Sequence, residues 1–129
     1  MEKKKLVIID DDVDILKSLE VILEDQGFEV HTAPGKEEGV ELYSEIDPDL
    51  IILDIMMESD LEGFSMLNDF RKPGETTLTP IIMYSGMAQE LGVNFRSAVE
   101  DEHQYPRVSF VDKREEVQDL IAKINEMLC

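Results

Sequence analysis

Several residue types are scarce in this chain of 129 residues, and each scarcity excludes a class of protein. A single cysteine, Cys129, excludes a disulfide framework within the chain and agrees with a reducing cytoplasm. With that cysteine and only two histidines, the sequence has no zinc-type cluster. No apolar stretch approaches the length of a membrane span, and the run after Lys3–Lys5 is too short for a signal peptide. We therefore expect a cytoplasmic protein.

Basic residues are also few compared with acidic ones, and this excess of negative charge limits which kinds of partner the protein can bind. The chain has 12 Lys and Arg against 30 Asp and Glu, a net charge of -18. Such a field repels nucleic acid and anionic membranes, so we expect neither as a partner. It suits a protein that binds other proteins or cations. The length predicts one domain over residues 1–129 with a core of its own.

Two apolar runs end in aspartate. Leu6–Ile9 leads into Asp10–Asp12, and Leu50–Leu53 leads into Asp54. Continuous apolar runs that stop at a charge are typical of strands buried on both faces of a parallel sheet. In such sheets ligands gather at the carboxyl ends of the strands. Carboxylates crowded at one edge repel one another unless a cation lies between them, and a divalent cation that prefers oxygen is the natural candidate.

The rest of the pattern alternates strands with helices. Strands are predicted at Lys5–Ile9, Phe28–Ala33, Asp49–Leu53, Pro80–Ser85 and Arg107–Val111. The predicted helices are an apolar repeat from Ile15 to Leu23 capped by Asp12 or Asp14, Lys36–Ile46, Gly63–Arg71, and a last helix from Val117 to Leu128 capped by Asp112. Five strands alternating with helices in one domain predict an α/β fold, a doubly wound parallel sheet with helices on both faces.

Polar side chains end four of the predicted strands. They are Asp10 and Asp11, Asp54, Ser85 and Lys113. If these strands are parallel, the side chains converge on one crevice. Carboxylates there can hold a magnesium ion, and a hydroxyl and an ammonium can bind the oxygens of an anion on the same metal. This set of groups suits the transfer of a phosphoryl group to a carboxylate.

These segments resemble the receiver domain of bacterial two-component response regulators over residues 4–128. The segments that carry the resemblance are Ile8–Asp12, Pro48–Met57, Gly63–Phe64, Pro80–Gly86 and Phe110–Lys113. The resemblance implies a single receiver-like domain over residues 1–129. It also implies a flavodoxin-like, five-stranded sheet in the order 2-1-3-4-5.

The resemblance implies an acceptor and a metal site. Asp54 matches the phosphoacceptor, which takes its phosphoryl group from a sensor histidine kinase or a phosphotransfer protein. Asp11 would bind Mg²⁺ directly and Asp10 mainly through water. The backbone carbonyl of Met56 would be a further ligand, beside Asp54 itself.

The resemblance also implies a switch. Ser85 matches the hydroxyl residue that moves toward the phosphoryl group, and Lys113 matches the lysine that pairs with that group. Phe110 matches the aromatic residue that turns inward when the hydroxyl residue moves.

The chain departs from the family pattern at three places. The loop Glu58–Glu62 lacks the usual proline, and Arg114 stands where a proline usually follows the lysine. A trans bond after Lys113 and a shifted lysine are therefore an alternative placement. The segment 86–106 is longer than usual, and we weigh an unusual partner surface there against a plain irregular loop.

Simpler interpretations exist for several of these residues. Asp10 and Asp11 could be solvated acids at a helix start, and Phe110 could be a core residue. His31 and His103 have no matched partners in the sequence, and we expect both at the surface or in loops.

Three functions are compatible with the sequence. The leading one is a stand-alone receiver, a signalling switch rather than an enzyme, which acts on a still unknown downstream protein by contact or by phosphorelay. The second is a receiver-like adaptor that is never phosphorylated. The third is a small magnesium-dependent phosphatase of the haloacid-dehalogenase type, whose nucleophile would lie at Asp10 instead of Asp54.

Overall fold

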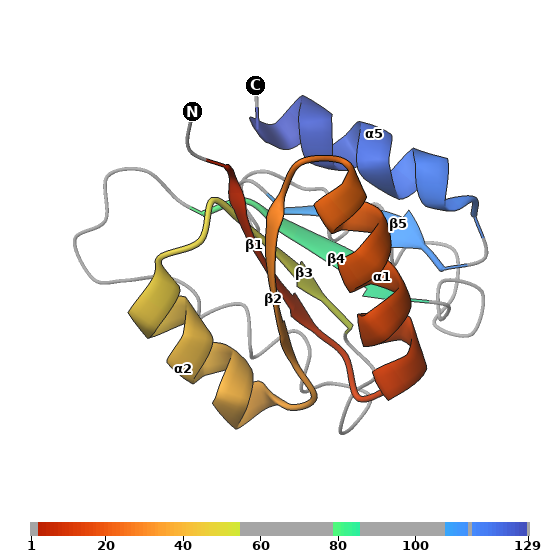
Figure 1. The fold of residues 1–129 in the computed structure, drawn as a ribbon. Helices are drawn as coiled ribbons and strands as arrows, with labels where there is room; N and C mark the ends of the chain where they lie inside the picture. Colours follow the sequence, from red (N-terminus) through yellow and green to blue (C-terminus); the bar gives the residue numbers. More distant parts are fainter. Residues whose placement is uncertain (1–2, 55–78, 86–107, 114, 129) are drawn as a thin grey trace.

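A computed structural model describes residues 3–54, 79–85, 108–113 and 115–128 of the chain. Its strands form one parallel sheet in the order β2-β1-β3-β4-β5 (Figure 1). This order confirms the predicted doubly wound fold. The predicted helix Gly63–Arg71, the loop 58–62, Met56, His103 and the segment 86–106 lie outside the described residues.

The strands lie within a residue of where the apolar runs predict them. They are β1 (Lys5–Ile9), β2 (Glu29–Ala33), β3 (Leu50–Leu53), β4 (Ile81–Ser85) and β5 (Val108–Asp112). All residues of β3, and Leu6 to Ile9 of β1, are buried, as expected of central strands covered on both faces. The prediction that Asp112 caps the last helix was wrong. Asp112 is the final residue of β5, paired in register with Ser85, and the helix begins only at Val117.

The helix after β1 begins at a side-chain cap, and both this helix and the one after β2 end near a residue in a left-handed conformation. In α1 (Val13–Asp25) the Asp12 carboxylate accepts the backbone N–H groups of Asp14 and Ile15, so Asp12 is the N-cap. The chain leaves this helix through Gly27, whose φ of 97° favours glycine. The helix α2 (Lys36–Ile46) ends at Asp47, which also adopts a left-handed conformation.

The helices form a layer on each face of the sheet. Apolar side chains of α1 and of α5 (Val117–Leu128) pack on one face in a single buried cluster with alternate residues of the strands. The strand residues in this cluster are Leu6, Ile8, Val30, Leu50, Ile52, Ile82, Tyr84 and Val111. On the other face α2 approaches β1 closely, and a Cβ on Gly39 would lie 2.7 Å from Cγ1 of Ile9. Figure 1 shows α1 and α5 as neighbours, with α2 apart from both.

The sheet continues one step beyond the strand ends that carry the acids. The backbone N–H of Asp10 donates to the carbonyl of Ala33 at 3.1 Å, and that of Asp54 donates to the carbonyl of Ile9 at 3.0 Å. Because Ile9 and Leu53 are register partners, Asp10 and Asp54 lie side by side on the next rung. The backbone hydrogen bonds between the parallel strands therefore place these carboxylates together at the carboxyl ends of the strands, as predicted.

His31 has a partner, contrary to the sequence-based expectation. It lies in the edge strand β2, and its Nε2 is 2.8 Å from Oε2 of Glu29. Residues two apart on a strand point to the same side, which explains the pairing. The hydrogen bond from His31 lowers the pKa of the Glu29 carboxyl.

Among the described residues, none of the helices combines the length and the apolar character that a membrane span requires.

Candidate functional site

Three carboxylates meet at the carboxyl ends of β1 and β3. Oxygens of Asp10, Asp11 and Asp54 all lie within 4.8 Å of one another. Asp10 is 2% exposed and Asp54 is 6% exposed, whereas Asp11 is open to solvent. Two buried carboxylates at this spacing repel each other strongly unless a cation balances them.

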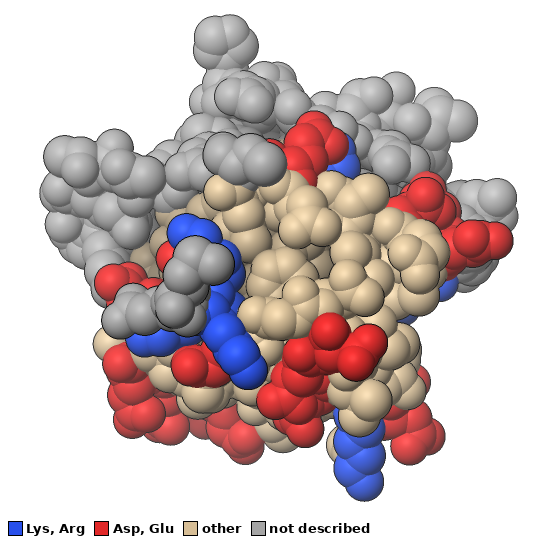
Figure 2. Space-filling view, turned by 45° about the horizontal axis from the view of Figure 1, so that its top comes forward, with Lys and Arg blue, Asp and Glu red and all other residues tan. Residues whose placement is uncertain are grey.

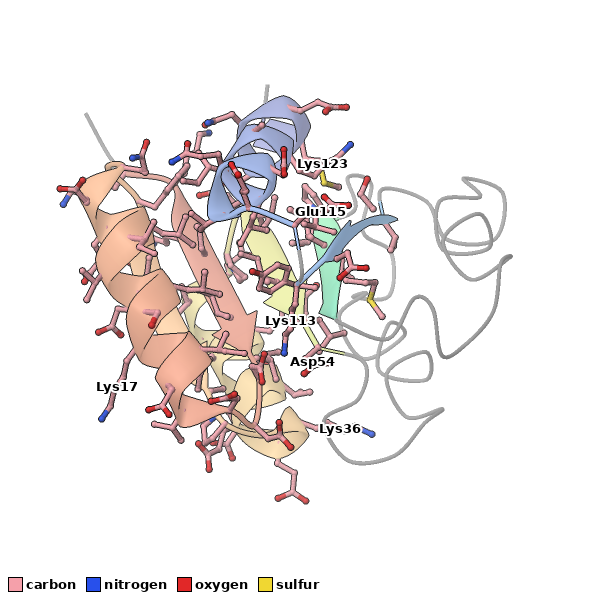
Figure 3. All side chains as sticks on the ribbon, turned by 90° about the vertical axis from the view of Figure 1, so that its right-hand side faces the viewer. Lys17, Lys36, Asp54, Lys113, Glu115 and Lys123 are labelled. Carbon is pink, nitrogen blue, oxygen red and sulfur yellow. The ribbon has the colours of Figure 1, made fainter. Side chains whose placement is uncertain are left out.

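Lys113 supplies that positive charge. Its Nζ lies 2.7 Å from Oδ2 of Asp10 and 2.9 Å from Oδ2 of Asp54. In Figure 3 the amine of Lys113 points to the Asp54 carboxylate, while the labelled Lys17, Lys36 and Lys123 lie away from it. Lys113 directly follows β5, so its ammonium group bridges the two buried acids from the end of that strand.

The protonation of these groups follows from burial and pairing. Burial raises the pKa of the Asp10 carboxyl, and hydrogen bonds from Lys113 and from the backbone N–H of Asp12 offset this only in part. Burial alone would lower the pKa of Lys113, but its hydrogen bonds to Asp10 and Asp54 outweigh that and raise it. Lys113 is therefore a permanently charged ammonium at neutral pH.

Tyr84 is a neighbour of the site that sequence reasoning missed. Its ring centroid lies 6.0 Å from the Nζ of Lys113, at the outer limit of a cation–π contact. Burial raises the pKa of its phenol, so the ring stays neutral. Only the strand pairing reveals this neighbour, because Leu53 pairs with Met83 and the step after that pair brings Tyr84 toward Asp54.

Most of the predicted site residues are among those that the structure describes. Asp10, Asp11, Asp54 and Lys113 come together at one edge of the sheet. The arginine after Lys113 does not remove the lysine from the site, so the alternative of a shifted lysine is not needed. Ser85 and Phe110 lie in β4 and β5, on strands adjacent to each other.

The acidic cluster fits a small hard cation. Mg²⁺ is bound by carboxylate and carbonyl oxygens and keeps part of its water shell, so it needs few protein ligands and an open side. Asp10 and Asp54 offer buried oxygens here, and Asp11 offers one that faces solvent. Within the part of the chain that the structure describes, no histidine or cysteine belongs to the cluster, which disfavours a zinc-type ion.

Comparison with known proteins identifies the family. A family model described as the response regulator receiver domain matches residues 6–125. The chain belongs to the response regulator receiver family. The sheet order and the position of the acids agree with that assignment.

The curated relatives of this receiver are longer proteins. It is 39% identical over 85 residues to the probable transcriptional regulator ycf27 of Guillardia theta, which covers 66% of this chain and 32% of the relative. It is 36% identical over 84 residues to the cell cycle response regulator CtrA of Brucella ovis, covering 65% of this chain and 35% of that protein. The aligned part thus spans about a third of the length of these relatives.

Solved structures resemble the receiver over nearly its whole length. A CheY-like receiver domain protein from Methanospirillum hungatei is 29% identical with a TM-score of 0.76, covering 98% of this chain and 94% of that one. The chemotaxis response regulator CheY4 of Vibrio cholerae, at 23% identity, has a TM-score of 0.78 and covers 98% and 100%. The second likeness shows the fold alone.

Proposed function

We propose that this receiver is a phosphorylation switch in which Asp54 accepts the phosphoryl group. The observation that carries the proposal is the setting of Asp54, a buried carboxylate that touches Lys113 and lies within 4.8 Å of Asp10 and Asp11. A nucleophilic carboxylate needs a neighbouring positive charge that can also hold the incoming oxygens. Asp54 has such a charge in contact, at a strand end where ligands gather.

The transfer needs positioning and charge balance more than acid–base chemistry. An oxygen of Asp54 attacks the phosphorus of a phosphorylated histidine, the P–N bond breaks, and the imidazole keeps the electron pair and takes a proton from solvent. Lys113 then moves its ammonium from the carboxylate oxygen to an oxygen of the bound phosphoryl group. When bound, Mg²⁺ supplies further positive charge for the same oxygens.

We propose Asp10, Asp11, Asp54 and the carbonyl of Met56 as the ligands of Mg²⁺. The family chemistry and the cluster of three carboxylates support this set. Asp11 is the exposed member, which suits a ligand that first meets a hydrated ion. Asp10 is already held by Lys113 and by the N–H of Asp12, which suits contact with the ion through water.

Ser85 and Phe110 are proposed as the moving parts of the switch. They lie on the adjacent strands β4 and β5, and Met83, two residues before Ser85, pairs in register with Phe110. A phosphoryl group on Asp54 would bias two arrangements of this region. We further propose residues 1–129 as one domain that acts on a downstream protein by contact or by phosphorelay, in the cytoplasm and without binding nucleic acid.

The test is the intact mass of the protein after incubation with acetyl phosphate. We expect one added phosphoryl group in the wild type with Mg²⁺, and none with a chelator or in Asp54→Asn. The matched control is Asp49→Asn, because Asp49 lies just before β3, at the end of that strand away from the site. This variant should be phosphorylated like the wild type.

The same assay separates the other two functions. An adaptor would show no adduct and no Mg²⁺ binding. A phosphatase with its nucleophile on β1 would lose its adduct in Asp10→Ala and keep it in Asp54→Asn. Either result would overturn the proposed role of Asp54.

A further inference from the structure

A groove runs between α1 and α5 on the face of the sheet that both helices cover. It consists of two hollows of about 270 Å³ and about 680 Å³ that share Ile22 and Val117. The smaller hollow begins at Tyr84, near the acidic site, and the larger one reaches Gln26, at the far end of α1. The larger hollow is therefore the part of the groove that lies away from Asp54.

The floor of this groove is apolar, with Ile22 and Val117 half-buried and Ile121 7% exposed. Ile22, Val117 and Ile121 line it from the two helices. Val21 on its rim is 67% exposed, the largest exposure among the large apolar side chains that the structure describes. An apolar floor between two helices has the shape that accepts a third helix, whose side chains fit between the ridges of the first two.

The rim of the groove carries charge of one sign. Asp14 lies at the end near the site, and Glu24 and Asp25 lie at the far end. Among the residues described, no lysine or arginine lines either hollow. Figure 2 shows a broad uncharged area with acidic side chains along its lower and right-hand borders and basic side chains at its left border.

We infer that the far half of this groove docks a basic amphipathic helix of a partner protein. The helix would place its apolar stripe over Val21, Val117 and Ile121 and its lysines or arginines against Glu24 and Asp25. A second copy of this chain, with a net charge of -18, and an anionic membrane would both meet repulsion at the same rim. Docking here does not use Asp54, so it goes beyond the proposed phosphorylation switch.

The test uses a model helix and the full chain. The probe is a fluorescently labelled peptide of leucine and lysine in a helical repeat, about 14 residues and roughly four turns long. Its binding is followed by fluorescence anisotropy in a buffer with a chelator, so that phosphorylation plays no part. A peptide with glutamate in place of lysine serves as the charge control and should not bind.

Matched variants decide where the peptide binds. Val21→Ser should weaken binding about tenfold, the factor that covering one valine supplies. Val13→Ser is the control, because Val13 is a 51% exposed valine of the same helix that lines neither hollow. For charge, Glu24→Lys with Asp25→Lys should weaken binding about tenfold, whereas Glu41→Lys with Glu45→Lys on α2 should not.

The outcomes are distinct. Loss of affinity in the groove variants with little change in the controls supports the inference. Equal loss in the groove and control variants would mean general attraction to an acidic protein and would overturn it. No binding by the wild type, or binding of the glutamate peptide, would overturn it as well, and none of these results bears on phosphorylation of Asp54.

Discussion

Lys113 is the residue on which the acidic site depends. Its ammonium touches both buried carboxylates, so the positive charge that the sequence requires between them is already part of the chain. A divalent cation that enters the cluster must therefore share or displace this contact. The lysine acts as an internal counter-ion, and in the proposed switch it would also bind the phosphoryl group on Asp54.

Replacing this lysine should weaken the fold and strengthen metal binding. In Lys113→Met the acids Asp10 and Asp54 stay buried without their ammonium, so we expect the free energy of unfolding to fall by about 1–3 kcal/mol with a chelator present. Because the ammonium no longer competes, the variant should bind Mg²⁺ more tightly than the wild type. Urea denaturation and a Mg²⁺ titration measure the two effects.

The control for this variant is Lys123→Met. Lys123 pairs with Glu126 on the surface of α5, and exposed pairs of this kind contribute little. This variant should match the wild type in both measurements. A Lys113→Met protein that is equally stable, or that binds Mg²⁺ more weakly, would contradict the role of Lys113 as counter-ion.

The burial of Asp10 predicts how the free energy of unfolding depends on pH. Its pKa in the folded protein is raised above 3.8 because the carboxyl is buried. Its contribution to stability is thus complete below pH 3.8 and is lost as pH rises through the raised pKa. Asp10→Asn, which cannot ionise, should therefore gain stability relative to the wild type as pH rises from 3.8 to 7 without metal. Urea denaturation across this range tests it, and a difference that shrinks with pH would contradict it.

At the scale of elements, the close approach of α2 to β1 sets how the second helix packs. Gly39 faces Ile9 so closely that an added Cβ would lie 2.7 Å from Cγ1 of that side chain. Periodicity predicted the bounds Lys36–Ile46 correctly. It could not reveal the role of this glycine, because a close approach depends on how two distant segments meet.

Gly39→Ala should therefore destabilise the protein, although alanine favours helices. Overpacking costs roughly 1–3 kcal/mol, and the helical preference of alanine returns about 1 kcal/mol, so we expect a net loss of up to about 2 kcal/mol in the free energy of unfolding. Ser44→Ala, on the exposed side of the same helix, should cause no loss. In the pair Gly39→Ala with Ile9→Val, the loss should be smaller than the sum of the single losses. Additive losses would contradict the contact.

Helices and strands could be predicted from the sequence wherever one local pattern determined them. The apolar runs predicted the strands to within a residue, and Asp12, one of the two caps predicted for α1, is its N-cap. The prediction for Asp112 failed because an acid before a helix can equally end a strand, and only pairing with Ser85 decides between the two. The partner of His31 was likewise missed, because it depends on which residues share one side of an edge strand, whereas its expected position at the surface agrees with a side chain that is 33% exposed.

At the scale of the whole molecule, charge and topology act together. Parallel strands in the order β2-β1-β3-β4-β5 bring Asp10, Asp54 and Lys113 together, although Asp10 and Lys113 are 103 positions apart in the sequence. The sequence predicted this convergence once the strands were recognised. The contact of Lys113 with both acids and the position of Tyr84 beside it required three-dimensional geometry.

The net charge of -18 predicts how the fold responds to salt. Self-repulsion opposes the compact state, so we expect the free energy of unfolding to rise with NaCl concentration as the charges are screened. At equal ionic strength Mg²⁺ should stabilise more if it binds the acidic cluster as proposed. In Asp11→Asn the extra effect of Mg²⁺ should shrink while the effect of NaCl remains. Equal effects of the two salts on the wild type would argue against a specific site.

The most direct measurement is to locate the phosphoryl group itself. The wild type is phosphorylated with acetyl phosphate and Mg²⁺, reduced with borohydride, which converts an aspartyl phosphate to homoserine, and sequenced by tandem mass spectrometry. We expect homoserine at position 54 alone. Homoserine at position 10 or 11, or at no position in a protein that binds Mg²⁺, would contradict Asp54 as the acceptor.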